Sequence, residues 1–291
     1  MTEANLIDRI HARAHRLGIA RGNGVLTGIG DDCAIFRQPG SKTDLVFTAD
    51  MMHESVHFTW DSRPSDVGHV ALTRSLSDCA AMGARPLFAL LSLAFPPQAA
   101  KWADGFFDGF LKLAKRHHVI LAGGDLSSTP AISCDVTVCG ELPRGKALLR
   151  SAARPGQRIC VSGPLGAAAL ALDSRSRFLP QAQLALGQLL REQGVKCAMD
   201  LSDGLSLDLS RLCLASGCAA ELVDVPIAKG ASLQHALHGG EDYALLFTLP
   251  KRLPLPPGCH IIGTIVNGAP GAVTFNGHPL PPQGWDHFRP S

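Results

Sequence analysis

The feature that most constrains this chain is a set of aspartates at turns and element ends, spread from residue 31 to residue 203. Asp200, Ser202 and Asp203 stand beside the start of a predicted helix, and similar acidic positions occur in segments 28–32, 48–50, 77–78 and 123–125. Carboxylates that converge without counterions repel one another strongly, so a fold that gathers these segments needs cations. Magnesium accepts oxygen ligands and leaves room for water and phosphate. The pattern therefore predicts a polyphosphate site that contains magnesium ions.

Each acidic segment also has an ordinary structural explanation. Gly and Asp populate turns for backbone reasons, which accounts for segment 28–32 on its own. Ser202 could serve only as a helix N-cap, with Asp203 favouring the first turn. Asp78 is less easily explained, because it lies near the C-terminal end of a predicted helix, where the dipole disfavours a negative charge by up to roughly 1 kcal/mol. The coincidence of all five acidic segments favours one shared site.

Length, composition and charge exclude several other classes of protein. The 291 residues suggest about two domains, and 46% hydrophobic with 18% charged residues is typical of a globular chain. A formal net charge of +2 with dispersed Lys and Arg indicates neither a nucleic-acid partner nor a membrane surface. The charges within residues 1–13 are unlike a signal peptide, and no apolar run approaches the roughly 18 residues of a membrane helix. We therefore expect a cytoplasmic protein.

The nine cysteines do not predict a metal or disulfide framework. None of them forms a C-x2-C pair, and the closest pairs lie in apolar surroundings. We expect all nine to be reduced thiols that are mostly buried.

Apolar periodicity predicts an α+β fold, an α/β sandwich in two domains, each with helices packed on a mixed, mostly antiparallel sheet. In the first half the expected helices cover 3–18, 65–83 and 98–117, and the expected strands cover 45–49, 86–95, 119–122 and 132–142. In the second half the expected strands cover 158–162, 219–225, 243–249 and 261–266, with helices after 166, over 181–193, and up to 215. The polar, turn-rich segment 143–156 places the boundary near residue 145, which gives domains 1–145 and 146–291.

Three further side chains are candidates on residue type alone. Arg150 could bind a phosphate through its planar guanidinium, although an arginine in a linker is more often a surface residue. His57 precedes an aromatic residue and could equally be a structural histidine. Trp285 lies between Gly284 and Asp286, which favours an exposed stacking role over a place in the core. There is neither a dinucleotide-binding glycine motif nor a P-loop.

A set of motifs then gives the sequence a resemblance to thiamine-monophosphate kinases over nearly the whole chain. In order they are GIGDDCA at 28–34, TAD at 48–50 with HF at 57–58, LSDCAAMGA at 76–84, GGD at 123–125, DLSDG at 200–204, GGEDY at 239–243 and WDHF at 285–288. Related enzymes such as aminoimidazole ribonucleotide synthetase share the general layout but not this set of motifs.

The resemblance implies ATP-dependent phosphorylation of thiamine monophosphate to thiamine diphosphate by a homodimer whose N-terminal domains pair through their sheets. Domain 1–145 would bind metal and ATP and form the dimer, and domain 146–291 would complete the ATP and substrate sites. The implied magnesium ligands are Asp32, Thr48, Asp50, Asp78, Asp125, Asp200 and Asp203. The implied ATP contacts are Gly124, Arg150 and Ser202, and the implied thiamine contacts are His57, Glu241 and Trp285. Arg150 and Asp203 would be catalytic.

The expected mechanism is direct in-line transfer without a phosphoenzyme, because an acceptor phosphate needs alignment and charge neutralisation rather than a strong base. Departures from the family pattern are Ala49 in place of a hydroxyl residue, Ser75 in place of Asn, and Leu126-Ser127 in place of two threonines, together with a short segment between 171 and 181. Two alternatives remain open: another ATP-dependent synthetase of the same superfamily, and a partly degenerate nucleotide-binding protein.

Overall fold

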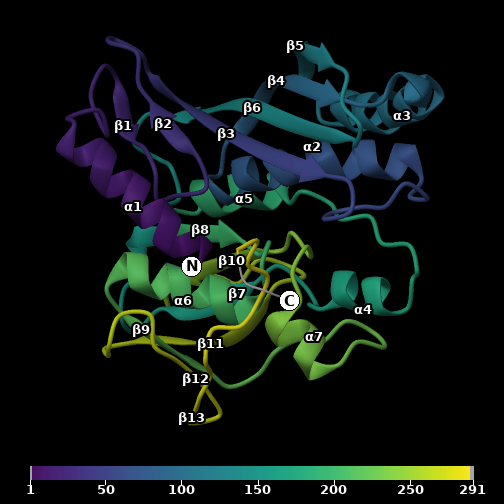
Figure 1. Ribbon diagram of the computed structural model, residues 1–291. Helices are drawn as coiled ribbons and strands as arrows, with labels where there is room; N and C mark the ends of the chain where they lie inside the picture. Colours follow the sequence, from purple (N-terminus) through teal and green to yellow (C-terminus); the bar gives the residue numbers. More distant parts are fainter. Residues whose placement is uncertain (1, 289–291) are drawn as a thin grey trace.

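The computed structural model describes residues 2–288, which form two sheets with helices between and outside them (Figure 1). Within these residues, seven α-helices pack on two mixed, mostly antiparallel sheets, so the predicted fold class is confirmed. The first sheet has the order β1-β2-β3-β6-β4-β5, and the second has the order β13-β12-β9-β11-β7-β10-β8.

The first sheet is built from the N-terminal half of the chain, whose long strands alternate buried and exposed side chains. Pro64 occupies the first turn of the central helix α2, where the missing N–H costs nothing. The elements are α1 (Glu3–Arg16), β1 (Val25–Thr27), β2 (Ala34–Phe36), β3 (Thr43–His53), α2 (Pro64–Ala81), β4 (Arg85–Ala94), α3 (Ala100–Arg116), β5 (Ile120–Ser127) and β6 (Ser133–Pro143).

The second sheet follows a short 3-10 turn, η2 (Arg150–Ala152). Its strand β10, between β7 and β8, is buried at every position, as expected for a strand covered on both faces. The elements are β7 (Arg158–Val161), α4 (Ala167–Asp173), α5 (Leu184–Glu192), β8 (Cys197–Asp200), α6 (Leu205–Ser216), β9 (Ala219–Leu222), α7 (Leu233–His238), β10 (Leu245–Leu249), β11 (His260–Val266), β12 (Val273–Phe275) and β13 (His278–Pro279).

Helices α2 and α5 lie between the two sheets (Figure 1). One hydrophobic core joins Leu76 on α2, Leu190 on α5 and Phe247 on β10, while the opposite face of the second sheet packs on α6 and α7. The predicted boundary near residue 145 falls between the last strand of one sheet and the first strand of the other. Because a single core crosses that boundary, its position at residue 145 stays a prediction.

The structure corrects the local prediction for segment 123–125. The sequence predicts a turn after a strand, but Gly123, Gly124 and Asp125 lie inside β5 and pair with β4. Gly124 has φ +150°, and an added Cβ would lie 1.8 Å from the carbonyl oxygen of Leu91, so this register requires glycine. Helix α7, the strands β1, β2 and β8 and the hairpin β12–β13 were also not predicted.

All nine cysteines are free and buried, as expected. None of the helices in residues 2–288 has the length and apolar character needed to cross a membrane.

Candidate active site

A cavity of about 1180 Å³ opens between the two sheets and takes its lining from both halves of the chain. Its walls come from α1, the loop before β2, β3, α2, η2, α4, the end of β8, α6 and the tail that follows β13. Most of the predicted site residues line it: Asp32, Thr48, Asp50, His57, Asp78, Arg150, Asp200, Ser202, Asp203, Glu241 and Trp285.

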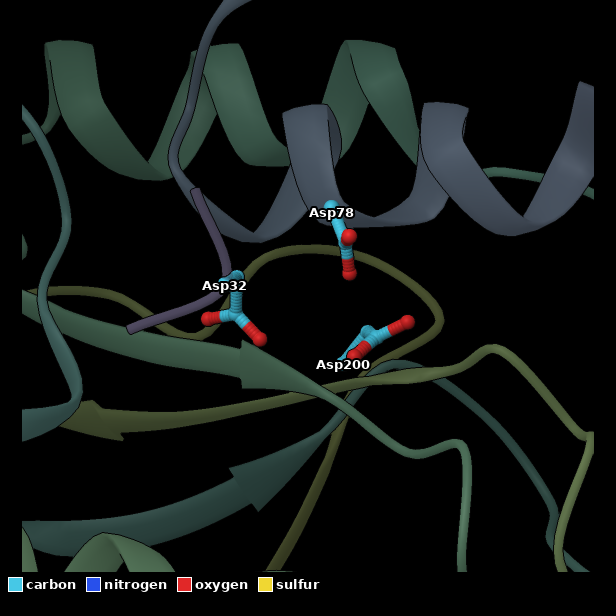
Figure 2. Close-up of side chains that lie close together, drawn as sticks. All are labelled: Asp32, Asp78 and Asp200. Atoms are coloured by element: carbon cyan, nitrogen blue, oxygen red, sulfur yellow. The ribbon is translucent and has the colours of Figure 1, made fainter. Parts of the chain in front are cut away.

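Three of these aspartates form an acidic centre in the cavity (Figure 2). Asp32 comes from the loop before β2, Asp78 from α2 and Asp200 from the end of β8, and one carboxylate oxygen of each lies within 4.8 Å of the others. Burial and then the charges of neighbouring aspartates raise the pKa of Asp78 and Asp200 well above the usual range. Asp32 Oδ2 is buried and has no hydrogen-bond partner. This oxygen-only set fits a hard divalent cation, which would supply the missing partner and the missing positive charge.

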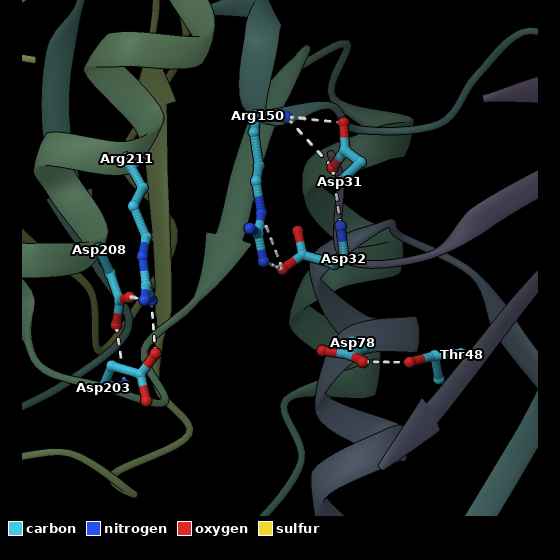
Figure 3. Close-up of polar contacts among 8 residues, drawn as sticks. All are labelled: Asp31, Asp32, Thr48, Asp78, Arg150, Asp203, Asp208 and Arg211. Atoms are coloured by element: carbon cyan, nitrogen blue, oxygen red, sulfur yellow. Dashed lines mark hydrogen bonds and ion pairs between the residues drawn. The ribbon is translucent and has the colours of Figure 1, made fainter. Parts of the chain in front are cut away.

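Strand β3 adds Thr48 and Asp50 to the edge of the acidic centre, because residues two apart on a strand face the same side. The Thr48 hydroxyl donates a hydrogen bond to Asp78 (Figure 3). The Ser75 hydroxyl on α2 donates to Asp50 Oδ2 at 2.9 Å. Ser75, one of the departures from the family pattern, therefore still holds an acidic side chain in place.

Arg150 reaches the acidic centre from the second half of the chain (Figure 3). Its guanidinium pairs with Asp32, and its backbone N–H donates to Asp31 Oδ2 at 3.2 Å. Burial and then the charge of Asp32 raise the pKa of Asp31 to about 7. The carbonyl oxygen of Arg150 accepts a hydrogen bond from the Ser216 hydroxyl at 2.7 Å. Arg150 is thus a fixed cation of the cavity rather than an exposed linker side chain.

Asp203 belongs to a small ionic network at the start of α6 (Figure 3). Arg211 pairs with Asp203, and its Nη1 also lies 3.0 Å from Asp208 Oδ1. Asp208 Oδ2 in turn accepts the backbone N–H groups of Asp203 and Gly204 at 3.0 and 3.1 Å. The N-cap of α6 is Gly204, so the alternative reading of Ser202 as an N-cap is wrong, and Ser202 instead lines the cavity.

At another part of the cavity wall, His57 and the tail lie together. His57 Nδ1 accepts the backbone N–H of His53 at 3.0 Å, and its Nε2 is buried without a partner. Burial and then the charge of Arg74 lower the pKa of His57 to about 4, so the ring is neutral near pH 7 with its proton on Nε2. The ring of His57 lies 5.2 Å from that of His287, centroid to centroid.

The tail carries Trp285, which is 52% exposed, as the sequence suggests. Its backbone N–H donates to the carbonyl oxygen of Asp203 at 3.1 Å. A Cβ added to Gly284 would lie 2.3 Å from the same oxygen, so glycine permits this close approach. The indole is therefore held at the cavity wall by the backbone beside Asp203.

Glu241 lies on a strained loop, because Glu241 and Tyr243 have left-handed φ angles of 65° and 51°. Between them, Asp242 accepts the backbone N–H groups of Gly166 and Ala168 at 2.5 and 2.9 Å and so caps the start of α4. This alternation places Glu241 and Tyr243 against the cavity.

Two predicted residues are not brought to the cavity in this chain. Gly124 and Asp125 lie on β5 at the edge of the first sheet, where both residues are exposed. Their proposed roles stay predictions. Conversely, the cavity wall includes Arg74 and Arg211, which the sequence analysis missed. Each is the one Lys or Arg of its helix. A single arginine among apolar neighbours that are buried was the signal in the sequence that could have marked these two residues as part of a site.

Comparisons with known proteins agree with this geometry. The model of the AIR synthase related protein, N-terminal domain, matches residues 30–142. The thiamine-monophosphate kinase of Salmonella typhimurium is 37% identical over 276 residues, covering 85% of this chain and 81% of its own length. That of Bacillus subtilis is 34% identical and covers 76% of this chain and 77% of its own.

Solved structures give the same result. The structure of AaThiL complexed with AMPPCP and TMP matches with a TM-score of 0.86 and 29% identity, covering 99% of this chain and 97% of that one. The thiamine-monophosphate kinase of Stenotrophomonas maltophilia K279a matches with a TM-score of 0.75 and 34% identity, covering 94% and 96%. On these sequence and structural matches, the chain belongs to the thiamine-monophosphate kinase family.

Proposed function

We propose that this protein transfers a phosphoryl group from ATP to thiamine monophosphate and so forms thiamine diphosphate in a magnesium-dependent reaction. The observation that carries the proposal is the meeting of Asp32, Asp78 and Asp200 inside a large cavity of a chain that belongs to this family. A set of buried carboxylates without enough cations is what a phosphoryl-transfer site needs in order to bind magnesium and polyphosphate together.

Magnesium would be held by Asp32, Asp78 and Asp200, with Thr48, Asp50 and Asp203 at the edge of the same centre. When bound, it would neutralise the charge of the phosphate groups. Asp125 is part of the proposed ligand set by family resemblance alone. Asp203, fixed by Arg211 and by its place before α6, keeps its carboxylate at the cavity wall.

Arg150 and Ser202 contact the phosphates of ATP in this proposal, with Gly124 as a further contact by resemblance. Asp32 holds the guanidinium of Arg150 and the Ser216 hydroxyl holds its backbone carbonyl, so the guanidinium donors are already oriented when a substrate arrives. It stabilises the charge that develops on the transferring group. An oriented guanidinium is well suited to this task because it is planar and permanently charged.

His57, Glu241 and Trp285 hold thiamine monophosphate. The indole face of Trp285 can stack on a cationic ring, an interaction of roughly 0.5 to 2 kcal/mol. The acceptor oxygen already belongs to a phosphate and needs no general base. Catalysis therefore consists of alignment and charge stabilisation, with direct in-line transfer and no covalent intermediate.

The proposed assembly is a homodimer formed by the first sheets of two chains. Strand β5 is an edge strand that is exposed along nearly its whole length, and it carries the exposed apolar side chains Ile120 and Leu126. An exposed, apolar edge of a sheet is a surface that proteins usually cover. We place the enzyme in the cytoplasm, where its nine unpaired thiols would stay reduced.

The direct test is an assay of the purified protein with ATP, magnesium and thiamine monophosphate. Formation of thiamine diphosphate with equimolar ADP is expected. A synthetase of the same superfamily would instead consume ATP only with an amide-containing substrate. A degenerate nucleotide-binding protein would bind ATP and form no product with either, and both results would contradict the proposal.

A further inference from the structure

We propose that Arg74 binds the phosphate group of the acceptor and makes the site select a phosphorylated substrate over the corresponding free alcohol. This inference rests on the proposed function, since it concerns the acceptor of that reaction. Arg74 is on α2 four residues before Asp78, so both side chains project from the same face of the helix. Arg74 therefore lies next to the acidic centre at which the phosphoryl group is transferred.

The contacts of Arg74 place it between that centre and the residues proposed to hold thiamine. Its Nη1 donates to Glu241 Oε1 at 3.1 Å, and its Nε lies 4.0 Å from Asp50 Oδ1. The centre of the guanidinium is 6.0 Å from the ring centroid of Tyr243. A group that touches Arg74 can thus reach Asp50 on one side and Glu241 on the other.

Three buried donors at this part of the cavity have no hydrogen-bond partner: Arg74 Nε, His57 Nε2 and Tyr243 Oη. His57 Nε2 carries its proton, because Nδ1 accepts the N–H of His53. The Tyr243 side chain is 2% exposed, so water gives its hydroxyl little compensation. Buried donors without acceptors are unfavourable and indicate a missing acceptor-rich ligand. A phosphate monoester supplies several acceptor oxygens and negative charge together.

The other two arginines of the cavity belong to other parts of it, and Arg150 is already assigned to ATP in the proposed function. Of the three arginines among the described residues that line the cavity, Arg150 is bound to Asp32, and Arg211 is bound to Asp203 and Asp208. Arg74 makes a single hydrogen bond to a carboxylate and retains other N–H groups for a ligand. A substrate without the phosphate would leave Arg74 Nε and the buried donors of His57 and Tyr243 without acceptors, and such sites reject analogues that lack the expected group.

The test measures the affinities of thiamine monophosphate and thiamine separately, by calorimetric titration with magnesium and a non-hydrolysable ATP analogue present. The wild type should bind thiamine monophosphate at least about tenfold more tightly than thiamine. Arg74→Met should weaken binding of thiamine monophosphate by about tenfold or more and leave thiamine within about twofold, so that the preference disappears. Arg74→Lys should keep part of the preference for thiamine monophosphate, because lysine retains the positive charge but not the planar set of donors.

Trp285→Ala is the matched comparison, because the indole is proposed to contact the ring that both ligands share. It should weaken the binding of both ligands by the same factor and preserve the ratio of their affinities.

Two results with Arg74→Met overturn the inference. If the affinities for both ligands fall equally, Arg74 only positions Glu241. If both affinities are unchanged, Arg74 is not part of the site. If Arg74→Met does not fold, a wild type that binds the two ligands equally overturns it as well. A wild type that forms no thiamine diphosphate at all contradicts the proposed function itself.

Discussion

At the residue scale, the acidic centre combines charges that the folded chain alone cannot balance. Asp78 and Asp200 are surrounded by other carboxylates, and burial further disfavours their charged forms. Their ionised forms are stable in this buried position only when a bound cation balances the negative charge. Function and stability therefore place opposite demands on these side chains.

Asp78→Asn should abolish turnover while the fold is retained. Loss of a direct ligand should exceed the roughly 10- to 100-fold effect of losing an outer partner, and the magnesium concentration for half-maximal rate should rise. The melting temperature without magnesium should not fall, because one repelling charge is removed. Rates across a magnesium titration and thermal unfolding check both expectations. Asp104→Asn, at an exposed position on α3, is the control. A wild-type rate at limiting magnesium would show that Asp78 is not a ligand.

The neutral state of His57 predicts a pH dependence of stability. Its folded pKa of about 4 lies below the ordinary value of 6.5, so between these values the unfolded chain binds more protons. His57 therefore contributes stability above pH 6.5 that is lost as the pH falls towards 4. The groups that face it, Arg74, His287 and His53, disfavour its protonated form.

His57→Gln should reduce this sensitivity to acid. The measurement is the difference in urea midpoint between pH 7.5 and pH 5, which should be smaller in His57→Gln than in the wild type. His278→Gln, at an exposed position in β13, should leave the difference unchanged. An equal difference in all three proteins would mean that His57 is not held neutral by its surroundings.

The sequence pointed to most of the aspartates that line the cavity and to Arg150 but missed Arg74 and Arg211, and the reason is positional. An aspartate at the end of a strand or in a turn is recognisable without knowing what packs against it. Arg74 and Arg211 lie inside helices, and their roles depend on which neighbours meet the same helix face. Asp208 is fully buried within α6, and only its bonds to the turn at Asp203 explain its presence.

At the scale of elements, neighbouring residues of the loop 239–243 have two different functions, and the sequence alone does not show which residue has which. Asp242 points to α4 and holds its start, while Glu241 and Tyr243 line the cavity. The left-handed φ angles that produce this alternation depend on contacts with residues 201 and 202. Segment 123–125 was mispredicted for a related reason, since a Gly-Gly pair indicates a turn unless the neighbouring strand is known.

Asp242→Ala should release both α4 and the loop. Losing a carboxylate that accepts two backbone N–H groups should lower stability by about 1 to 2 kcal/mol. The KM for thiamine monophosphate should rise while the KM for ATP changes little, because Glu241 shares the loop. Ser174→Ala removes a hydroxyl bond at the opposite, exposed end of α4 and should have a much smaller effect. Equal changes in both KM values would mean that the loop does not act specifically on the substrate.

At the scale of the whole molecule, the two sheets share one core, so the cavity is part of the general packing of the chain. The pattern of apolar residues was enough to predict the longer strands of both sheets and most helices. It could not predict that α2 would be covered by α5 and β8, because that contact joins residues more than 100 positions apart.

Leu126→Glu should weaken the proposed dimer by placing charges on the exposed strand β5. Light scattering at micromolar concentration should give the mass of two chains for the wild type and a lower average mass for Leu126→Glu. Val223→Glu, an equally exposed apolar position next to β9, should keep the dimer mass. A wild type with the mass of one chain would exclude this assembly.

The position of α2 between the sheets also affects the order in which the protein can mature on the ribosome. The first sheet and α2 are synthesised before α5 and β8, so the side of α2 that faces them stays uncovered until about residue 200 has emerged. Asp32 and Asp78 are synthesised early, but the acidic centre is incomplete until Asp200, at the end of β8, has also emerged. The nascent chain thus acquires its apolar cover and its magnesium-binding capacity in one late step, and a product truncated near residue 145 should require chaperones and bind magnesium poorly.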